Sequence, residues 1–421
     1  MKVYIATFGC RANHYDSEAA RAMLEAGGAQ MVDAPEDADV ALFNSCAVTS
    51  RAEADLRSGI RRAARANPRL RTVVMGCASA LDARRDPARS LRVLPAVESV
   101  VAGADLDGVA RALGIDPALA LRRRAHQSGA RALLRIQDGC DEHCTFCATT
   151  QARGVNRSRP LAELLEEAGR LAEWHAEIVL TGVHIGSYGA DLGGGASLSV
   201  LVERLVTEVP RARFRLSSVE ATEVDDRLRE LLVAGDSGLV PYLHAPLQSG
   251  SDRVLRRMGR HWYSASTYAT AVERIVRDGS VFGLGADVIA GFPGERDEDH
   301  RATMAMVESL PFTGLHVFPY SLRPGTAAER LGERVHGEEV SRRASELRAL
   351  AARKARDYES QRIGGRADVI VIGGARGAAW SGLTEDYLAV TIPDRGIARG
   401  SRIDTLLEAR DGTLFARPLQ P

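Results

Sequence analysis

Residues 140–147 read CDEHCTFC, and they follow the apolar run Ala132-Ile136, which is typical of a buried strand. Cys140, Cys144 and Cys147 are spaced C-x3-C-x2-C. Three thiolates on one short loop can hold three irons of a 4Fe–4S cluster, whose usual complement is four cysteines, so the fourth iron would be open to substrate atoms. The alternative is a zinc site with His143 as the fourth ligand.

Downstream of this loop, short apolar runs alternate with helical patterns such as Leu161-Trp174 and Ser266-Arg277. The strands that we predict after Ala132-Ile136 are Glu177-Thr181, Arg213-Ser217, Pro241-His244, Gly283-Ile289 and Leu315-Pro319. Six parallel strands joined by crossover helices would make a partial barrel or an open sheet. Residues 335–360 read as a charged helix.

The first 115 or so residues show the same alternation, which predicts an N-terminal parallel sheet. One helix is expected from about Ser17 to Glu25, and another from about Ser50 to Ala66, before Pro68. The strands that we predict in this region are Val3-Ala6, Val40-Phe43, Val73-Met75 and Val97-Val101.

Cys10, Cys46 and Cys77 each follow one of these strands. Because ligands bind at the carboxyl ends of strands in open α/β sheets, we expect the three cysteines to converge at one sheet edge. Six cysteines clustered in this way indicate metal or redox chemistry in a reducing compartment. The alternative, three disulfides, suits the 140–147 segment poorly because bridging needs particular Cα separations.

From Gly364 onward the sequence changes to short β-type runs, which predict a small barrel. The runs are Asp368-Ile372, Tyr387-Ile392, Arg402-Glu408 and Thr413-Arg417, and the expected turns are Gly373-Gly374, Pro393-Asp394 and Asp411-Gly412. We therefore predict an α/β protein with an N-terminal domain at 1–117, a basic linker at 118–131, a central domain at 132–360 and an all-β domain at 361–421.

The 421-residue chain carries 55 basic and 55 acidic side chains, so its formal net charge is zero. A zero net charge excludes a protein that binds nucleic acid through a large overall positive charge. Binding through a local basic patch is still possible. No apolar stretch reaches the roughly 18 residues that a membrane span needs, and the first residues lack the pattern of a secretory signal. We expect a soluble, cytoplasmic protein without a membrane partner.

These motifs together resemble the radical S-adenosylmethionine methylthiotransferases that act on tRNA and ribosomal proteins. The resemblance spans nearly the whole chain. It is carried by Phe8-Gly9-Cys10-Arg11 with Asn13, Asn44-Ser45-Cys46, Gly76-Cys77, the 140–147 loop, residues 246–251 (PLQSGS) and residues 287–295 (DVIAGFPGE). It implies an N-terminal auxiliary-cluster domain, a central partial (β/α)6 radical barrel and a C-terminal TRAM domain.

Within the family, three stretches resemble the branch that acts on threonylcarbamoyladenosine in tRNA. They are residues 13–18 (NHYDSE), residues 180–184 (LTGVH) leading to Tyr188-Gly189, and residues 316–321 (HVFPYS). This branch adds a methylthio group to C2 of N6-threonylcarbamoyladenosine next to the anticodon. The alternatives are isopentenyladenosine in tRNA, a ribosomal-protein residue, or, from another class, a non-catalytic zinc-stabilised RNA-binding module.

The resemblance implies two 4Fe–4S clusters and S-adenosylmethionine as cofactors. Cys140, Cys144 and Cys147 would hold the radical cluster, and Cys10, Cys46 and Cys77 the auxiliary cluster. The implied partners are a tRNA anticodon stem-loop and an electron-donor protein such as flavodoxin or ferredoxin. The sequence departs from the family in two places: Ala148-Thr149-Thr150 replaces two aliphatic residues and a proline, and Ala78-Ser79 replaces an aromatic-containing segment.

Several further residues are implied as cofactor contacts, each with a structural alternative. Phe146 would lie near the adenine or pack in the core. Ser218 and Glu220 would make polar contacts with the cofactor or cap a helix, and Gln248 and Asp287 are similar candidates. Gly291 and Gly294 would allow close backbone approach or only a tight turn. Glu295 could equally face solvent.

Two groups of arginines are candidates for RNA contact, because arginine grips phosphate and stacks on bases. Arg153, Arg157 and Arg159 come just after the cysteine loop, where a substrate must arrive. Residues 57, 61 and 65, all arginine, recur every four positions and would share a helix face. The alternative for that face is simple solvation.

Overall fold

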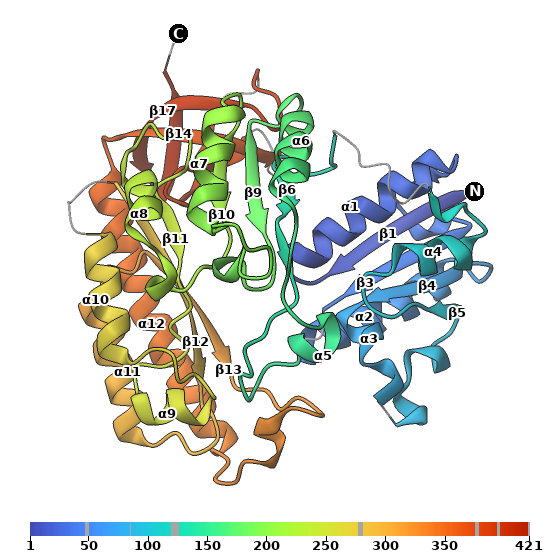
Figure 1. Cartoon of the computed structure of the whole chain (residues 1–421), viewed down its shortest axis with the longest axis horizontal. Coiled ribbons are helices and arrows are strands. Elements are labelled where there is room, and N and C mark those ends of the chain that lie inside the picture. The colour runs from blue at the N-terminus through green and yellow to red at the C-terminus, as the bar shows by residue number, and fades with distance from the viewer. Residues whose placement is uncertain are drawn as a thin grey trace.

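The computed structural model describes residues 1–46, 50–84, 86–118, 126–276, 281–374, 379–393 and 396–419 (Figure 1). Half of the predicted linker (residues 119–125), the end of the predicted helix at Arg277 and the second residue of the turn at Pro393-Asp394 lie outside these residues. The predicted fold class is confirmed: a parallel-sheet domain, a partial barrel and a small closed β barrel follow one another along the chain.

The N-terminal domain is a five-stranded, all-parallel sheet with the order β2-β1-β3-β4-β5. Apolar side chains of α1 and α4 pack on one face, and those of α2 pack on the other. The elements are β1 (Lys2–Phe8), α1 (Arg11–Ala26), β2 (Gln30–Met31), β3 (Val40–Ser45), α2 (Ser50–Ala66), β4 (Arg71–Gly76), α3 (Cys77–Ala80), β5 (Val97–Val100) and α4 (Leu106–Leu113).

The central domain holds six parallel strands in two groups of three, β10-β9-β6 and β11-β12-β13. Parallel bridges from Phe214 to Leu239 and from Ser218 to His244 join the two groups, so the strands form a partial barrel rather than two separate sheets. The strands are β6 (Ala132–Arg135), β9 (Glu177–Thr181), β10 (Arg213–Leu216), β11 (Tyr242–His244), β12 (Gly283–Ala290) and β13 (Gly314–Pro319).

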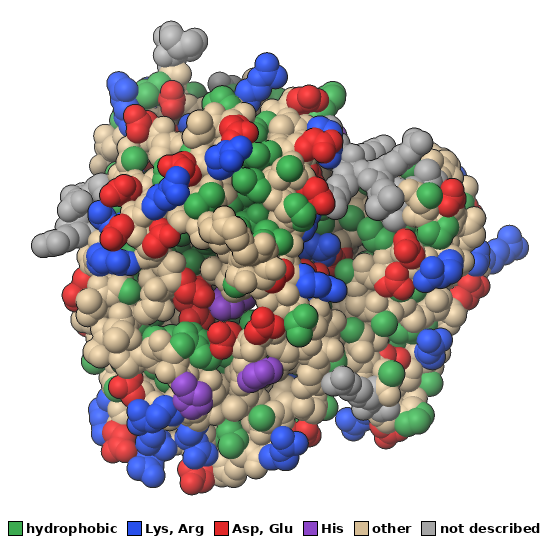
Figure 2. Space-filling model, in the orientation of Figure 1, with side chains coloured by type: hydrophobic (Ala, Val, Ile, Leu, Met, Phe, Trp, Pro, Cys, Tyr) green, Lys and Arg blue, Asp and Glu red, His purple; other side chains and the backbone are tan. Residues whose placement is uncertain are grey.

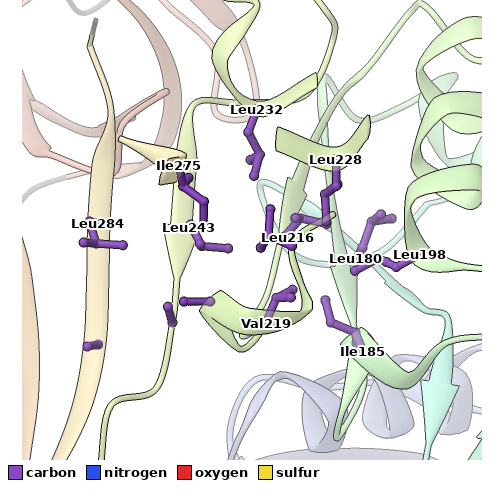
Figure 3. Close-up of a cluster of buried hydrophobic side chains, with 14 of the residues drawn as sticks. Leu180, Ile185, Leu198, Leu216, Val219, Leu228, Leu232, Leu243, Ile275 and Leu284 are labelled. Carbon is purple, nitrogen blue, oxygen red and sulfur yellow. The ribbon is translucent and has the colours of Figure 1, made fainter. Parts of the chain in front are cut away.

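Helices cover the outside of this partial barrel (Figure 1). Leucines from four neighbouring strands, among them Leu180 and Leu243, meet helix side chains such as Leu198, Leu228 and Ile275 in a continuous core (Figure 3). The helices are α6 (Leu161–Ala172), α7 (Leu198–Glu208), α8 (Asp226–Val233), α9 (Asp252–Arg257), α10 (Ala265–Ile275), α11 (Asp297–Ser309) and α12 (Gly337–Arg362).

The C-terminal strands close into a barrel with the order β14-β15-β16-β18-β17. The predicted turn at Gly373-Gly374 is wrong, because both glycines pair with β15 across a bulge and continue β14. The turn at Asp411-Gly412 is present. The strands are β14 (Arg366–Gly374), β15 (Trp380–Thr384), β16 (Ala389–Ile392), β17 (Arg402–Arg410) and β18 (Thr413–Pro418).

A buried ion cluster attaches this small barrel to the central one. Glu177 accepts hydrogen bonds from Arg213 and Arg215, and the same two arginines donate to backbone carbonyls of Asp368, Thr384 and Glu385. Burial opposes ionisation of Glu177, but the arginines prevail and hold its pKa well below the usual value. Among the described helices, none is long and apolar enough to span a bilayer.

Candidate active site

The three N-terminal cysteines lie at the carboxyl ends of neighbouring parallel strands. Cys10 precedes α1, Cys46 follows β3, and Cys77 begins α3 directly after β4. A hydrogen bond from Cys46 lowers the pKa of Cys10 to about 6 against the opposing effect of burial. All six cysteines of the chain are free, so the disulfide alternative is wrong.

Close backbone packing holds the Cys10 and Cys46 loops together. A Cβ at Gly9 would lie 2.9 Å from the Cβ of Cys46, so only glycine allows this approach. Asn13 accepts from the Cys10 thiol at 3.2 Å and donates to the side chain of Asn44 at 3.0 Å. The Asn44 amide donates back to the Asn13 carbonyl at 2.7 Å, which fixes both loops.

Arg153 links this site to the central domain. Its Nε lies 3.3 Å from the Sγ of Cys77, and its terminal nitrogens pair with Asp16 at 2.7 Å and Asp138 at 3.1 Å. The helix that Arg153 ends, α5 (Thr149–Arg153), packs against α3. The helix beginning at Cys77 therefore lies against the helix beginning two residues after Cys147.

This position argues against RNA contact for Arg153, whose side chain is only 5% exposed. Arg159 is also committed inside the protein, where it pairs with Glu167 at 2.7 Å and donates to the Arg135 carbonyl. The sequence could not separate these arginines from Arg157, which is exposed and keeps its predicted role as an RNA contact.

Each thiol of the 140–147 loop lies close to an N–H donor. The amide of Glu142 points at the Sγ of Cys140 at 3.4 Å, and the amide of Thr149 points at that of Cys147 at 3.3 Å. Arg260 lies 3.4 Å from the Sγ of Cys144. Such donors stabilise thiolates and tune iron–sulfur clusters, so the residues present fit a cluster.

The geometry does not suit a single zinc ion. Zinc–sulfur bonds of about 2.3 Å would bring the ligand sulfurs within about 4 Å of one another. In the described part of the chain, the one group of three ligand atoms that lie within 4.8 Å of one another is His244, Asp287 and His316, with no cysteine in it. His143 is exposed and does not belong to that group either, so the described residues give the zinc alternative no support.

Two predicted cofactor contacts have structural partners of their own. Phe146 meets Phe292 edge to face, with ring centroids 6.3 Å apart. Glu220 caps the 3-10 turn Ala221–Glu223 and accepts hydrogen bonds from Arg260 and Trp262. Arg260 thus bridges Glu220 and the Cys144 thiol, a link that the sequence did not reveal. Ser218 is exposed just past β10.

The glycine segment after β12 is explained by packing. A Cβ at Gly291 would lie 2.4 Å from Val340 of α12, and one at Gly294 would meet Arg257. Glu295 is buried and pairs with Arg343 at 2.9 Å, so the alternative that it faces solvent is wrong. Cofactor contact by Gly291 stays a prediction.

Asp287 lies inside the barrel between two histidines. It accepts from His244 at 2.9 Å and contacts the Nδ1 of His316 at 3.2 Å. Burial raises the pKa of Asp287, but the two histidines reverse this and hold it well below its usual value. Gln248, at a positive φ of 62°, is paired through its backbone with β12 and is half-buried.

Comparisons with known proteins agree with this architecture. Residues 2–101 match the uncharacterized protein family UPF0004, and residues 134–307 match the radical SAM superfamily. A radical S-adenosylmethionine methyltransferase from Kitasatospora setae, TsrM, superposes with a TM-score of 0.58 at 15% identity, covering 78% of this chain and 74% of that one. This likeness concerns the fold.

Sequence relatives are closer. The threonylcarbamoyladenosine tRNA methylthiotransferase MtaB of Bacillus subtilis is 35% identical, over 84% of this chain and 81% of that protein. The Thermotoga maritima protein of the same name is 33% identical, over 92% and 90%. The tRNA-2-methylthio-N(6)-dimethylallyladenosine synthase of Jannaschia sp. is 34% identical, over 88% and 83%. The chain therefore belongs to the radical S-adenosylmethionine methylthiotransferases of the MtaB type, enzymes that use S-adenosylmethionine and iron–sulfur chemistry.

Proposed function

We propose that this enzyme adds a methylthio group to C2 of N6-threonylcarbamoyladenosine next to the anticodon of tRNA. One observation carries the proposal: α3, which begins at Cys77, packs against α5, which follows Cys147. This packing places Cys77, at the start of α3, near the loop that holds Cys147, and supports the proposal that the two cysteine trios act together. Methylthiolation needs both a means of activating an adenine carbon and a nearby source of sulfur, and two neighbouring cysteine sites fit that requirement.

The six cysteines fit two 4Fe–4S clusters. Cys140, Cys144 and Cys147 would hold the radical cluster, and the N-terminal trio would hold the auxiliary cluster that presents sulfur. With S-adenosylmethionine bound, the radical cluster supplies a one-electron cleavage that can activate an adenine C–H bond, which acid–base groups cannot do. An electron-donor protein such as flavodoxin or ferredoxin would supply the electron.

The chain's own residues orient these sites. Arg260, which contacts the Cys144 thiol and Glu220, holds the loop against the end of β10. His184 lies 3.9 Å from the Cys140 thiol and 2.7 Å from Glu223. Burial lowers the pKa of His184, but its bonds to Cys140 and Glu223 raise it to about 10. A histidine held in this way keeps a donor pointing at the loop.

The nucleic-acid partner we propose is the tRNA anticodon stem-loop. Acidic and basic side chains are mixed over the face of the molecule that Figure 2 shows, so no single basic surface covers this view. A single-stranded adenosine can be splayed into a pocket at little cost. Arg157, which is exposed, is the arginine of its group that remains available for the RNA backbone.

We assign the sulfur-bearing site to residues 1–117, the radical site to residues 132–360 and an RNA-positioning role to residues 361–421, and we place the reaction in the cytoplasm.

Isopentenyladenosine is the second candidate substrate. The Jannaschia synthase, whose name gives the dimethylallyl form of this nucleoside, is 34% identical to this chain, and the MtaB relatives are equally similar at 33–35%. The stretch 316–321 (HVFPYS) favours threonylcarbamoyladenosine.

The test is an anaerobic reaction of the reconstituted enzyme with two stem-loop RNAs that differ only in the modified adenosine, followed by nucleoside mass spectrometry. We expect a methylthio group on threonylcarbamoyladenosine and none on isopentenyladenosine. Methylthiolation of the isopentenyl substrate alone would overturn the substrate assignment. Cys140→Ala is the control and should give no product on either RNA.

A further inference from the structure

Arg11, directly after Cys10, is a half-buried cation without an acidic partner. Among the described residues, no carboxylate lies within ion-pair distance of it. Within the described part of the chain, the one hydrogen bond of its side chain runs from Nη2 to the hydroxyl of Tyr387, at 2.8 Å. A guanidinium carries five N–H donors in a planar fork, so most of its bonding capacity is open.

Tyr387 holds Arg11 from a distant part of the chain. It lies between β15 and β16 at a φ of 75°, a strained conformation for a residue other than glycine. Its ring stacks on Tyr242 of β11, with centroids 4.4 Å apart and planes 18° apart. A residue of the C-terminal barrel therefore reaches the interior of the central barrel and meets the first residue of α1.

Arg11 lines a pocket together with His14, Arg131 and one acid, Glu18, whose carboxylate accepts hydrogen bonds from Ser128. Arg11 is near enough to His316 and Tyr242 to influence the pKa of both. His316 is 67% exposed, and the nearby carboxylate, Asp287, is already shared by two histidines. A half-buried, fork-shaped cation in the neighbourhood of an exposed histidine suits a carboxylate.

The proposed substrate has one carboxylate on its base, at the end of the threonylcarbamoyl group. We propose that Arg11, positioned by Tyr387, binds this carboxylate and so distinguishes threonylcarbamoyladenosine from adenosines with uncharged substituents. The inference rests on the proposed function and adds a specificity-determining residue to it. Because Arg11 adjoins Cys10, this contact would also fix the base relative to the N-terminal cysteines.

The test compares two anticodon stem-loops, one with threonylcarbamoyladenosine and one in which its carboxylate is replaced by a carboxamide. Binding is measured by fluorescence anisotropy on the anaerobically reconstituted enzyme without reductant, so that no turnover occurs. We expect the parent to bind the acid at least about tenfold more tightly than the amide. Arg11→Gln should bind both equally, and Arg11→Lys should restore part of the preference.

Two further variants make the comparison specific. Arg301→Gln removes an exposed arginine of α11 and should keep the parental ratio. Tyr387→Phe removes the hydroxyl that holds the guanidinium and should reduce the ratio by about threefold. Because the acid-to-amide ratio is taken within each variant, partial misfolding would lower both affinities and leave the ratio unchanged.

The outcomes separate this inference from the proposed function. An Arg11→Gln enzyme that keeps the parental ratio would overturn the role of Arg11. A parent enzyme that binds acid and amide equally but methylthiolates threonylcarbamoyladenosine would overturn carboxylate recognition alone. Methylthiolation of isopentenyladenosine only would overturn both.

Discussion

The Nε of Arg153 lies 3.3 Å from the Sγ of Cys77, although the two residues belong to different domains. The same guanidinium pairs with Asp16 of α1 and with Asp138, which precedes the cysteine loop. A single buried side chain therefore joins the end of α5 to the edge of the N-terminal sheet. Together with the ion pair between Arg135 and Asp16, this contact joins the two domains that carry the cysteine trios.

Replacing Arg153 should uncouple the two domains. Arg153→Gln leaves the buried carboxylate of Asp16 with Arg135 as its remaining partner, and we expect a loss of about 3 kcal/mol in the free energy of unfolding. Urea denaturation of the iron-free chain measures it. Adding Asp16→Asn to Arg153→Gln should recover part of the loss. A change of less than about 0.5 kcal/mol, as expected for exposed Arg301→Gln, would contradict the coupling.

The two cysteine trios should bind iron independently. The parent should contain about eight irons per chain after reconstitution, and Cys140→Ala or Cys77→Ala about four. Reductive cleavage of S-adenosylmethionine should be lost in Cys140→Ala and kept in Cys77→Ala. Iron analysis and product chromatography check both points. Equal loss of all iron in either variant would show that the trios do not form separate sites.

Arg260 should tune the radical cluster, because charges and hydrogen bonds at the sulfurs set reduction potentials. In a Cys77→Ala background, which leaves one cluster, Arg260→Gln should lower the potential by removing a cation next to the Cys144 thiol. Glu220→Gln removes the opposing charge and should raise it. Redox titration followed by electron paramagnetic resonance measures the potentials. Shifts of the same sign in both variants would refute the electrostatic explanation.

The sequence predicted the parts of the fold whose signal is local. Val40-Phe43 and Val73-Met75 are short apolar runs, and both are buried strands. Because neighbouring parallel strands end at the same edge, the convergence of Cys10 and Cys46 followed from strand order and chain direction. The C-x3-C-x2-C spacing of Cys140, Cys144 and Cys147 is also local, so it could be recognised without knowledge of contacts between distant residues.

Features that depend on distant partners could not be predicted. The first helix begins at Arg11, whereas the sequence predicted a start near Ser17. The prediction missed the first turns because Asn13 and Asp16 are polar yet buried. Their hydrogen-bond partners lie 31 and 119–137 residues away in the sequence. The same reason explains Arg153, which looks like a surface arginine in sequence. The strand Trp380–Thr384 was missed because serine and glycine interrupt its apolar pattern.

The cluster around Glu177 predicts sensitivity to acid. The pKa of Glu177 in the folded protein lies below the usual 4.5. The ion pairs of ionised Glu177 therefore stabilise the folded state fully above pH 4.5, and this stabilisation is lost as the pH falls below that value. The iron-free parent should lose up to about 1.4 kcal/mol per pH unit more than Glu177→Gln below pH 4.5, measured by urea denaturation. Parallel pH profiles for the two chains would contradict this account.

The proposed substrate can be checked in vivo by nucleoside mass spectrometry of tRNA from cells that lack this gene. We expect threonylcarbamoyladenosine to lose its methylthio group and isopentenyladenosine derivatives to be unchanged. The parent gene should restore the modification, and Cys77→Ala should not. If threonylcarbamoyladenosine keeps its methylthio group and the isopentenyl nucleoside loses it, the proposed substrate is wrong.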